Sequence, residues 1–255
     1  MKLNSNTLPE SMFIPLFESQ CFRIVPQNTS HEIFIYHCYI KIAILRDIME
    51  DKKGTTTLSI VCKGGVVAAA ERRATMGTLI AHKVAKKIYK IDDHLFLTTA
   101  GLVGDAQILA RYMRVESELY KLEREERMPI KGAATLMANF LNQRKFYPYY
   151  VQLIIGGVDS SGPHIFSIDA AGGAIEDIYT TTGSGSPYVF GVLEDKYHKD
   201  MSIDEGIDLA IRALVAAMKR DSASGDGIDV IAVTEKEYIE LKDEEIEERK
   251  KKMGL

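Results

Sequence analysis

The order of strand-like and helix-like segments is the feature that most restricts the fold of this chain. Two short β-favouring runs, residues 56–62 and 66–70, are joined by Lys63, Gly64 and Gly65, which predicts a hairpin. Further strands are predicted at residues 88–90, 95–100, 150–158, 164–168 and 228–234. The helical segments lie between and after these groups of strands.

Two helical segments follow one another between the strand groups. The first, residues 105–127, ends before Pro129 and has apolar residues at spacings of three and four. Its predicted apolar face consists of Ile108, Leu109, Tyr112, Val115, Leu119 and Leu122. The second, residues 130–144, ends before Pro148. Its predicted apolar face consists of Leu136, Met137, Phe140 and Leu141. We expect the two helices to lie antiparallel as neighbours.

A further helix is marked by its first residues. Ser202 and Glu205 have the spacing of a capping box and predict a helix that runs to Lys219. Its apolar stripe consists of Ile203, Ile207, Ile211, Leu214 and Met218. Residues 243–253 are predicted to form a highly charged helix or tail. Strands and helices segregated in this order favour stacked layers of the α+β class over a doubly wound parallel sheet.

Composition excludes several classes of protein. The 255 residues are 46% hydrophobic and 27% charged, which fits one globular domain of ordinary size. A net charge of -4 gives no basic footprint for nucleic acid. The three cysteines are scattered and the six histidines lack metal-ligand spacing, so we expect neither a disulfide framework nor a metal or other cofactor.

One apolar run, residues 33–45, is the candidate membrane segment. It is interrupted by His37 and Lys41 and is shorter than the ~20 residues of a spanning helix. It also lies too far from the start for a signal peptide, and no small-residue cleavage site follows it. We therefore predict a cytoplasmic protein without a membrane segment.

The character of the chain changes near residue 54. Residues 1–48 show no sustained periodicity, and a short polar stretch, residues 49–54, follows them. We expect residues 1–54 to be a leader that is removed, and residues 55–255 to be the functional domain. Met49 is an alternative start, in which case residues 1–48 are not translated.

Gly54 and Thr55 form a junction with chemical meaning. A threonine hydroxyl is a weak nucleophile that needs a base, and a free α-amine on the same residue, with a pKa of about 8, can serve as that base. Cleavage between Gly54 and Thr55 would create this amine, and glycine leaves the preceding carbonyl unshielded for attack. Taken alone, however, the three consecutive threonines are better explained as the start of a β-strand.

Several other motifs accompany this junction. They are Glu71-Arg72-Arg73, the run from His82 to Ile88, the run from Thr99 to Asp105, Gly183-Ser184-Gly185-Ser186-Pro187, and the run from Arg220 to Gly225. Together with Thr55, and in this order, they resemble the proteasome β-subunit family in its archaeal form. The resemblance covers residues 55–255, and it implies a threonine protease made as an inactive precursor that cuts itself after Gly54.

The resemblance implies roles for particular residues. Lys87 matches the family's catalytic lysine, and Glu71 takes the acidic position that pairs with it, where most members have aspartate. Ser184, Asp221 and Ser224 match the residues around the new amino terminus. The backbone N–H of Gly101 matches the oxyanion donor. Substrate-binding positions are matched by Ala74, Thr75, Ala85, Thr99 and Val103, whose mostly small or apolar side chains favour cleavage after hydrophobic residues.

The resemblance also implies a fold and an assembly. The fold is the four-layer αββα sandwich of N-terminal nucleophile hydrolases. The assembly has two inner heptameric β rings between two α rings, and an ATPase ring supplies unfolded polypeptide. Three alternatives remain open: a threonine protease served directly by an unfoldase ring, a small-molecule amidase that also cuts itself, and an inactive subunit that serves as a scaffold.

Overall fold

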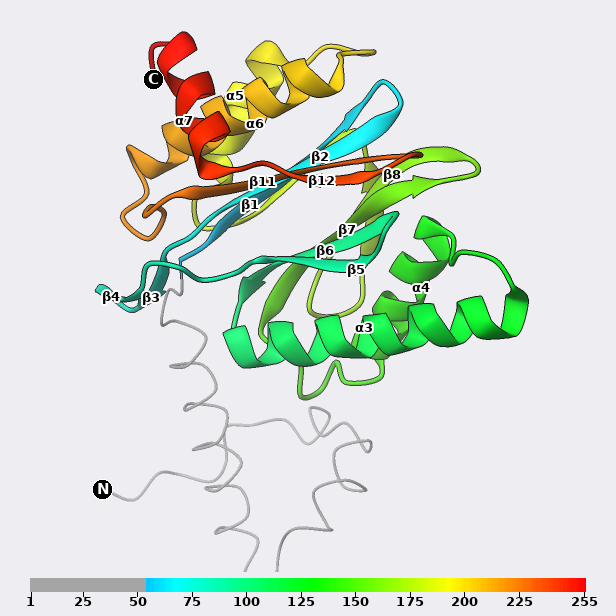
Figure 1. Ribbon diagram of the computed structural model, residues 1–255. Coiled ribbons are helices and arrows are strands. Elements are labelled where there is room, and N and C mark those ends of the chain that lie inside the picture. Colours follow the sequence, from blue (N-terminus) through cyan, green and yellow to red (C-terminus); the bar gives the residue numbers. More distant parts are fainter. Residues whose placement is uncertain (1–53) are drawn as a thin grey trace, which may run out of the picture. The chain divides into compact units, whose positions relative to one another are not determined.

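The fold is built on two five-stranded antiparallel sheets. The computed structural model describes residues 54–255, so residues 1–53 of the predicted leader, Met49 among them, lie outside the described part. The first sheet has the strand order β10 (Tyr179–Gly183), β1 (Thr56–Cys62), β2 (Gly65–Glu71), β11 (Ile228–Thr234) and β12 (Tyr238–Glu240). The second has the order β5 (Ile88–Asp92), β6 (Leu95–Gly101), β7 (Val151–Asp159), β8 (Gly162–Ile168) and β9 (Ala174–Asp177). The two sheets stack face to face (Figure 1).

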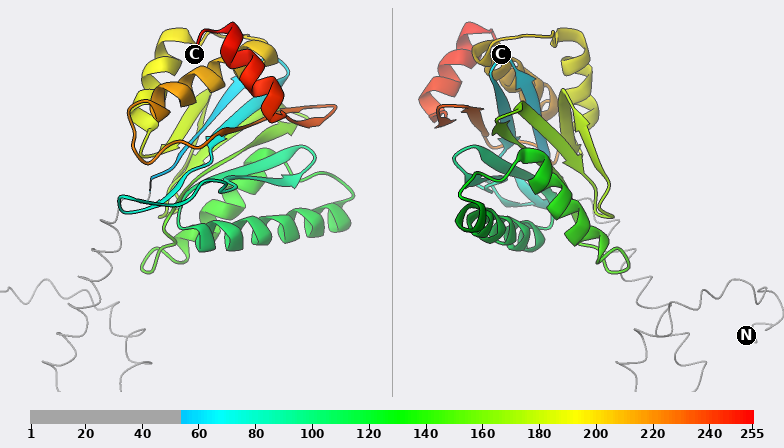
Figure 2. Two further views of the ribbon diagram at one scale, coloured as in Figure 1. Left: turned by 60° about the vertical axis from the view of Figure 1, so that its left-hand side comes forward. Right: turned by 90° about the vertical axis from the view of Figure 1, so that its right-hand side faces the viewer.

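Helices cover the outer face of each sheet (Figures 1 and 2). The first sheet carries α5 (Ser186–Lys196), α6 (Ile203–Met218) and α7 (Asp243–Lys252), and the second carries α3 (Val103–Arg124) and α4 (Ile130–Asn142). A separate hairpin, β3 (Ala74–Met76) with β4 (Leu79–His82), extends from the end of β2. The four-layer αββα arrangement confirms the predicted fold.

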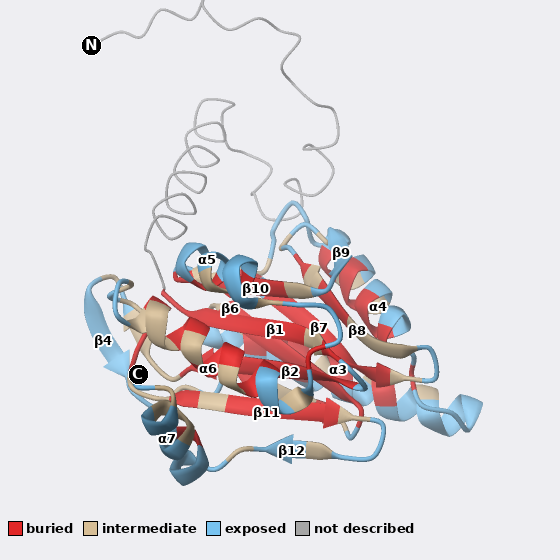
Figure 3. Cartoon of the chain, turned by 90° about the horizontal axis from the view of Figure 1, so that it is seen from above, coloured by how far each residue is buried: buried red, intermediate tan, exposed pale blue. Residues whose placement is uncertain are grey.

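Strand β2 shows how the layers are held together. Val67 and Ala69 belong to the core beneath α6, whereas Val66, Ala68 and Ala70 belong to the core between the sheets. Successive side chains of a strand point to opposite faces, so a strand buried on both faces is apolar throughout. Figure 3 accordingly shows β1 and β2 as almost wholly buried. A third core joins the second sheet to α3 and α4.

The predicted apolar face of α3 is largely wrong. The buried residues of α3 are Ala106, Leu109, Ala110, Met113 and Ser117. Of the predicted face, only Leu109 is among them, while Ile108, Val115, Leu119 and Leu122 are exposed. The buried face combines Leu109 and Met113 with the small residues Ala106, Ala110 and Ser117. Alanine and serine contribute little to an apolar periodicity, so the pattern was dominated by larger apolar side chains that are exposed.

The other helices follow their patterns more closely. In α4, Met137 and Leu141 are buried, and Leu136 and Phe140 pack at the edge of the same core. In α6, Ile207, Ile211 and Leu214 are buried and the predicted capping box is present, which confirms this prediction. The β3–β4 hairpin, β9, β10, α5 and β12 were not predicted. None of the helices in residues 54–255 combines the length and apolarity needed to cross a bilayer.

Candidate active site

The site begins where β1 leaves Thr55. Thr56 pairs with Gly183 of β10, and the backbone N–H of Ser184 donates to the carbonyl of Thr55 at 2.8 Å. Gly183 has φ +96°, and a Cβ there would lie 1.8 Å from the carbonyl oxygen of Thr55. This close approach requires glycine. The turn that carries Ser184 is thereby held against Thr55, which is itself 6% exposed.

Glu71 and Lys87 form a buried ion pair beside this junction. Glu71 ends β2 and is fully buried, and Lys87 immediately precedes β5. The ammonium of Lys87 donates to Oε1 of Glu71 and to the carbonyl of Arg73. The same Oε1 accepts the backbone N–H of Thr56 at 3.0 Å. One carboxylate oxygen thus joins the lysine to the residue that follows Thr55.

Burial acts on both members of this pair. It raises the pKa of Glu71 and lowers the pKa of Lys87, because water no longer solvates either charge. The attraction between the two charges opposes both shifts, and the N–H groups of Thr56 and Gly225 that bind the carboxylate also oppose the rise in the pKa of Glu71. The ammonium therefore loses its proton more readily than that of an exposed lysine, and the two groups titrate together.

A directional chain of hydroxyl groups lies on the other side of Thr56. Oδ2 of Asp221 accepts hydrogen bonds from Ser184 Oγ and Ser224 Oγ, each at 2.6 Å. Because Ser224 donates to Asp221, its oxygen is left to accept from Thr56 Oγ1, also at 2.6 Å. Thr56 Oγ1 in turn accepts the N–H of Gly185 at 3.1 Å. Each of these three hydroxyl groups, on Ser184, Ser224 and Thr56, therefore has a defined hydrogen-bond partner.

Gly101 lies at the end of β6, close to the same junction. It has φ +124°, and a Cβ there would lie 2.1 Å from the carbonyl oxygen of Tyr150, so only glycine fits. A Cβ at Gly183 would lie 3.4 Å from the Cβ of Ala100. The end of β6 therefore adjoins the turn that holds Thr55.

Four of the five predicted substrate-binding residues lie in segments that adjoin the ion pair. Ala74 and Thr75 belong to β3, and the N–H of Ala85 donates to the carbonyl of Arg72 at 2.8 Å. Thr99 is buried, and its N–H donates to the carbonyl of Lys87 at 3.0 Å. Val103, the first residue of α3, is exposed. The predicted preference for hydrophobic residues stays a prediction.

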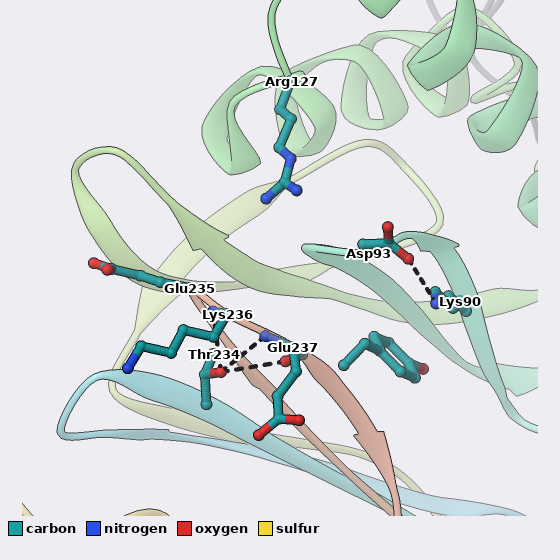
Figure 4. A pocket seen from close by; sticks show the side chains of 8 residues that line it. Lys90, Asp93, Arg127, Thr234, Glu235, Lys236 and Glu237 are labelled. Carbon is teal, nitrogen blue, oxygen red and sulfur yellow. Dashed lines mark hydrogen bonds and ion pairs between the residues drawn. The ribbon is translucent and has the colours of Figure 1, made fainter.

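Two surface hollows lie elsewhere on the described part of the chain. One, of about 260 Å³, lies among the β5–β6 turn, Arg127 and residues 234–238, as Figure 4 shows. Its β11 side is at Thr234, whereas Glu71 pairs with Ile228 at the opposite end of β11. A seven-residue strand spans about 20 Å, so this hollow is remote from Thr55. The other is lined by α6 and α7 residues such as Asp204 and Arg249.

Sequence reasoning missed three contributors to the site. Thr56 links the ion pair to the hydroxyl chain, through its N–H and its hydroxyl respectively. The N–H groups of Arg73 and Gly225 donate to Oε2 of Glu71 at 2.7 and 3.1 Å. Three of these contacts use backbone N–H groups, which leave no signal in side-chain identity. The threonine at position 56, which also fits the β-propensity of a strand, is the one side-chain signal among them.

Comparisons with known proteins agree with this arrangement. A family model described as proteasome subunit matches residues 51–233. The proteasome subunit beta of Ferroglobus placidus is 61% identical over 196 residues, which are 76% of this chain and 93% of the relative. The proteasome subunit beta of Thermoplasma acidophilum is 56% identical over 203 residues, which are 79% of this chain and 96% of the relative. The proteasome subunit beta of Methanosarcina barkeri is 58% identical over 195 residues, which are 76% of this chain and 92% of the relative. The chain therefore belongs to the proteasome subunit family, among its archaeal-type β subunits.

Proposed function

We propose that the chain is cut after Gly54 and that Thr55 then hydrolyses peptide bonds as an amino-terminal nucleophile. The observation that carries this proposal is the oxygen atom that Lys87 and the Thr56 N–H share on Glu71. It ties a buried ammonium to the backbone beside Thr55. A proteolytic role in general follows from membership among the β subunits, and the threonine mechanism is the finer claim.

The first stage acts on the uncut chain, in which Thr55 has no free amine. Oγ of Thr55 attacks the Gly54 carbonyl, the carbon–nitrogen bond breaks, and the proton of Oγ passes to the departing nitrogen. The positive charge of Lys87 favours loss of this proton. Water then hydrolyses the ester, which leaves a carboxylate on Gly54 and both a hydroxyl and an amine on Thr55.

The second stage uses the amine made by the first. The amine takes the proton of Oγ while Oγ attacks a substrate carbonyl, and the Gly101 N–H stabilises the developing oxyanion. The proton then passes to the leaving amine, and water releases the acyl group. Asp221, Ser184 and Ser224 hold the amino terminus in place. The continuous hydrogen bonding from Asp221 to Thr56 supports this role.

We also propose that the chain works within an assembly in the cytoplasm. Its partners would be α-subunit rings, other β subunits in stacked heptameric rings, and an ATPase ring that supplies unfolded polypeptide. Exposed apolar side chains support this proposal, because a monomeric protein rarely leaves many of them in contact with water and a partner subunit would cover them. They include Ile108, Val115, Leu119 and Leu122 on α3, and Met76, Leu79 and Ile80 on the β3–β4 hairpin.

The decisive experiment compares Thr55→Ala with Thr55→Ser in the full chain, co-expressed with its α partner. Thr55→Ala should remain uncut and should not hydrolyse peptides, because it has no hydroxyl. Thr55→Ser keeps the hydroxyl and should still be cut. Amino-terminal sequencing of the unmodified protein should give threonine at position 55. Cleavage or robust peptide hydrolysis by Thr55→Ala would refute the proposal.

A further inference from the structure

Gly54, the residue before the proposed cut, is held on two sides. Its N–H donates to Oγ1 of Thr75 at 3.0 Å. On another side it faces Ala223, since a Cβ built on Gly54 would lie 1.6 Å from the Cβ of Ala223. The next contacts of that Cβ would be 2.9 Å to Cα of Ala223 and 3.1 Å to Oγ of Ser184. No side chain fits at position 54 in this arrangement.

We propose that Ala223 and Thr75 are positioning residues for self-cleavage: Ala223 is the wall that restricts position 54 to glycine, and the Thr75 hydroxyl fixes the Gly54 amide. The inference rests on the proposed function, because it concerns the same bond. It adds two residues that touch the cleaved peptide from opposite elements, the hairpin β3–β4 and the turn at 221–224.

The wall cannot move without disturbing the site. The N–H of Ala223 donates to Oδ1 of Asp221 at 3.2 Å, and the N–H of Ser224 donates to the Asp221 carbonyl at 3.1 Å. Asp221 Oδ2 binds Ser224, which binds Thr56. A side chain at 54 would therefore displace either this turn or the Gly54 carbonyl. A misplacement of about 1 Å at a reacting centre can cost roughly 100-fold in rate.

The Thr75 hydroxyl acts on the other side of the same residue. A hydrogen bond to the Gly54 N–H restricts rotation of the peptide that precedes the attacked carbonyl. Thr75 lies where the register of the β3–β4 hairpin shifts, between Ala74 and Thr75. The hairpin is otherwise exposed, with Met76 and Leu79 pointing to solvent. The side chain of Thr75 thus connects an exposed element to the cleavage junction.

A double-mutant cycle tests the wall. The full chain is co-expressed with its α partner in four forms: unmodified, Gly54→Ala, Ala223→Gly, and both changes together. Cleavage of the precursor is followed over time by intact mass. Gly54→Ala should slow cleavage roughly 100-fold in the unmodified background. In the Ala223→Gly background the same change should cost roughly tenfold or less, because the 1.6 Å overlap is gone and only the contacts of 2.9 Å to Cα of residue 223 and 3.1 Å to Oγ of Ser184 then need to relax.

The outcomes of this cycle are distinct. If glycine is needed at 54 for backbone freedom alone, the Gly54→Ala penalty will be equal in both backgrounds, and Ala223 is not a wall. If the unmodified chain is never cut, the proposed function fails, and this inference fails with it. Cutting of the unmodified chain with equal penalties overturns only the inference.

Two substitutions of Thr75 test the hydroxyl. Thr75→Val keeps the shape of the side chain and removes the hydroxyl that accepts the Gly54 N–H. It should slow precursor cleavage by up to roughly tenfold, which corresponds to the free energy of one ordinary hydrogen bond. Thr75→Ser keeps the hydroxyl and should cut at close to the unmodified rate. Equal rates for the two variants would show that the hydroxyl is not needed and would overturn its role.

Discussion

The buried carboxylate of Glu71 binds the ammonium of Lys87 through Oε1. The remaining capacity of this carboxylate is used as well, since Oε1 accepts the Thr56 N–H and Oε2 accepts the N–H groups of Arg73 and Gly225. The Glu71 carboxylate therefore has a full set of partners. Three separate segments of the chain meet at this one side chain.

Shortening Glu71 should impair the site. Glu71→Asp withdraws the carboxylate by about 1.5 Å, so it cannot satisfy all four donors. Each buried donor left unsatisfied costs about 1–3 kcal/mol, and we expect precursor cleavage to slow by roughly 10- to 100-fold. The measurement is the first-order rate of cleavage by intact mass. Glu118→Asp, on the exposed face of α3, is the matched control and should cut normally. A normal rate in Glu71→Asp would show that the longer side chain is not required.

The pH dependence of self-cleavage should be bell-shaped. Below the raised pKa of Glu71 the carboxyl gains a proton, and above the lowered pKa of Lys87 the ammonium loses one. The ion pair thus exists over a narrower range than an exposed pair, whose limits are about 4.3 and about 10.4. The precursor is the right species to measure, because it has no Thr55 amine to titrate. A rate that keeps rising beyond about pH 10.4 would contradict a requirement for the charged lysine.

Asp221 should matter through both of its serines. Asp221→Asn removes the charge to which Ser184 and Ser224 donate, and hydrogen bonds to charged groups are worth about 1.5–3 kcal/mol. We expect peptide hydrolysis by the assembled enzyme to fall by at least about tenfold. Asp195→Asn, an exposed aspartate on α5, provides the control. If the two variants were equally active, the hydrogen bonds that link Asp221 to Thr56 through Ser224 would have no role in the reaction.

Much of the fold could be predicted because its signals are local. The capping box at Ser202 and the glycine turn after Cys62 each specify a boundary through a few neighbouring residues. Strand β10 was missed because its sequence, Tyr-Thr-Thr-Thr-Gly, lacks apolar residues beyond the tyrosine and is buried through pairing with β1. Helix α5 was missed because glycine and serine before Pro187 favour a turn, whereas Pro187 lies in the first turn of the helix.

The candidate site was predictable only where side chains carry the signal. Glu71 and Lys87 are 16 residues apart, and only the family resemblance connected them to each other and to Thr55. The structure supplies the direct contact between them. The contributions of the Arg73 and Gly225 N–H groups could not be predicted, because any residue except proline carries such a donor.

The corrected face of α3 gives a test of stability with an internal control. Leu109 is 0% exposed and Leu122 is 76% exposed on the same helix. Leu109→Ala should lower the free energy of unfolding by about 2–5 kcal/mol, because it leaves a cavity beneath the second sheet. Leu122→Ala should change it by no more than about 0.5 kcal/mol. Urea unfolding of the unassembled chain measures both free energies. If the slope of the unfolding free energy against urea concentration is unchanged, a shifted midpoint reports a change in stability. A larger loss for Leu122→Ala than for Leu109→Ala would mean that α3 packs through the apolar face first predicted from its periodicity.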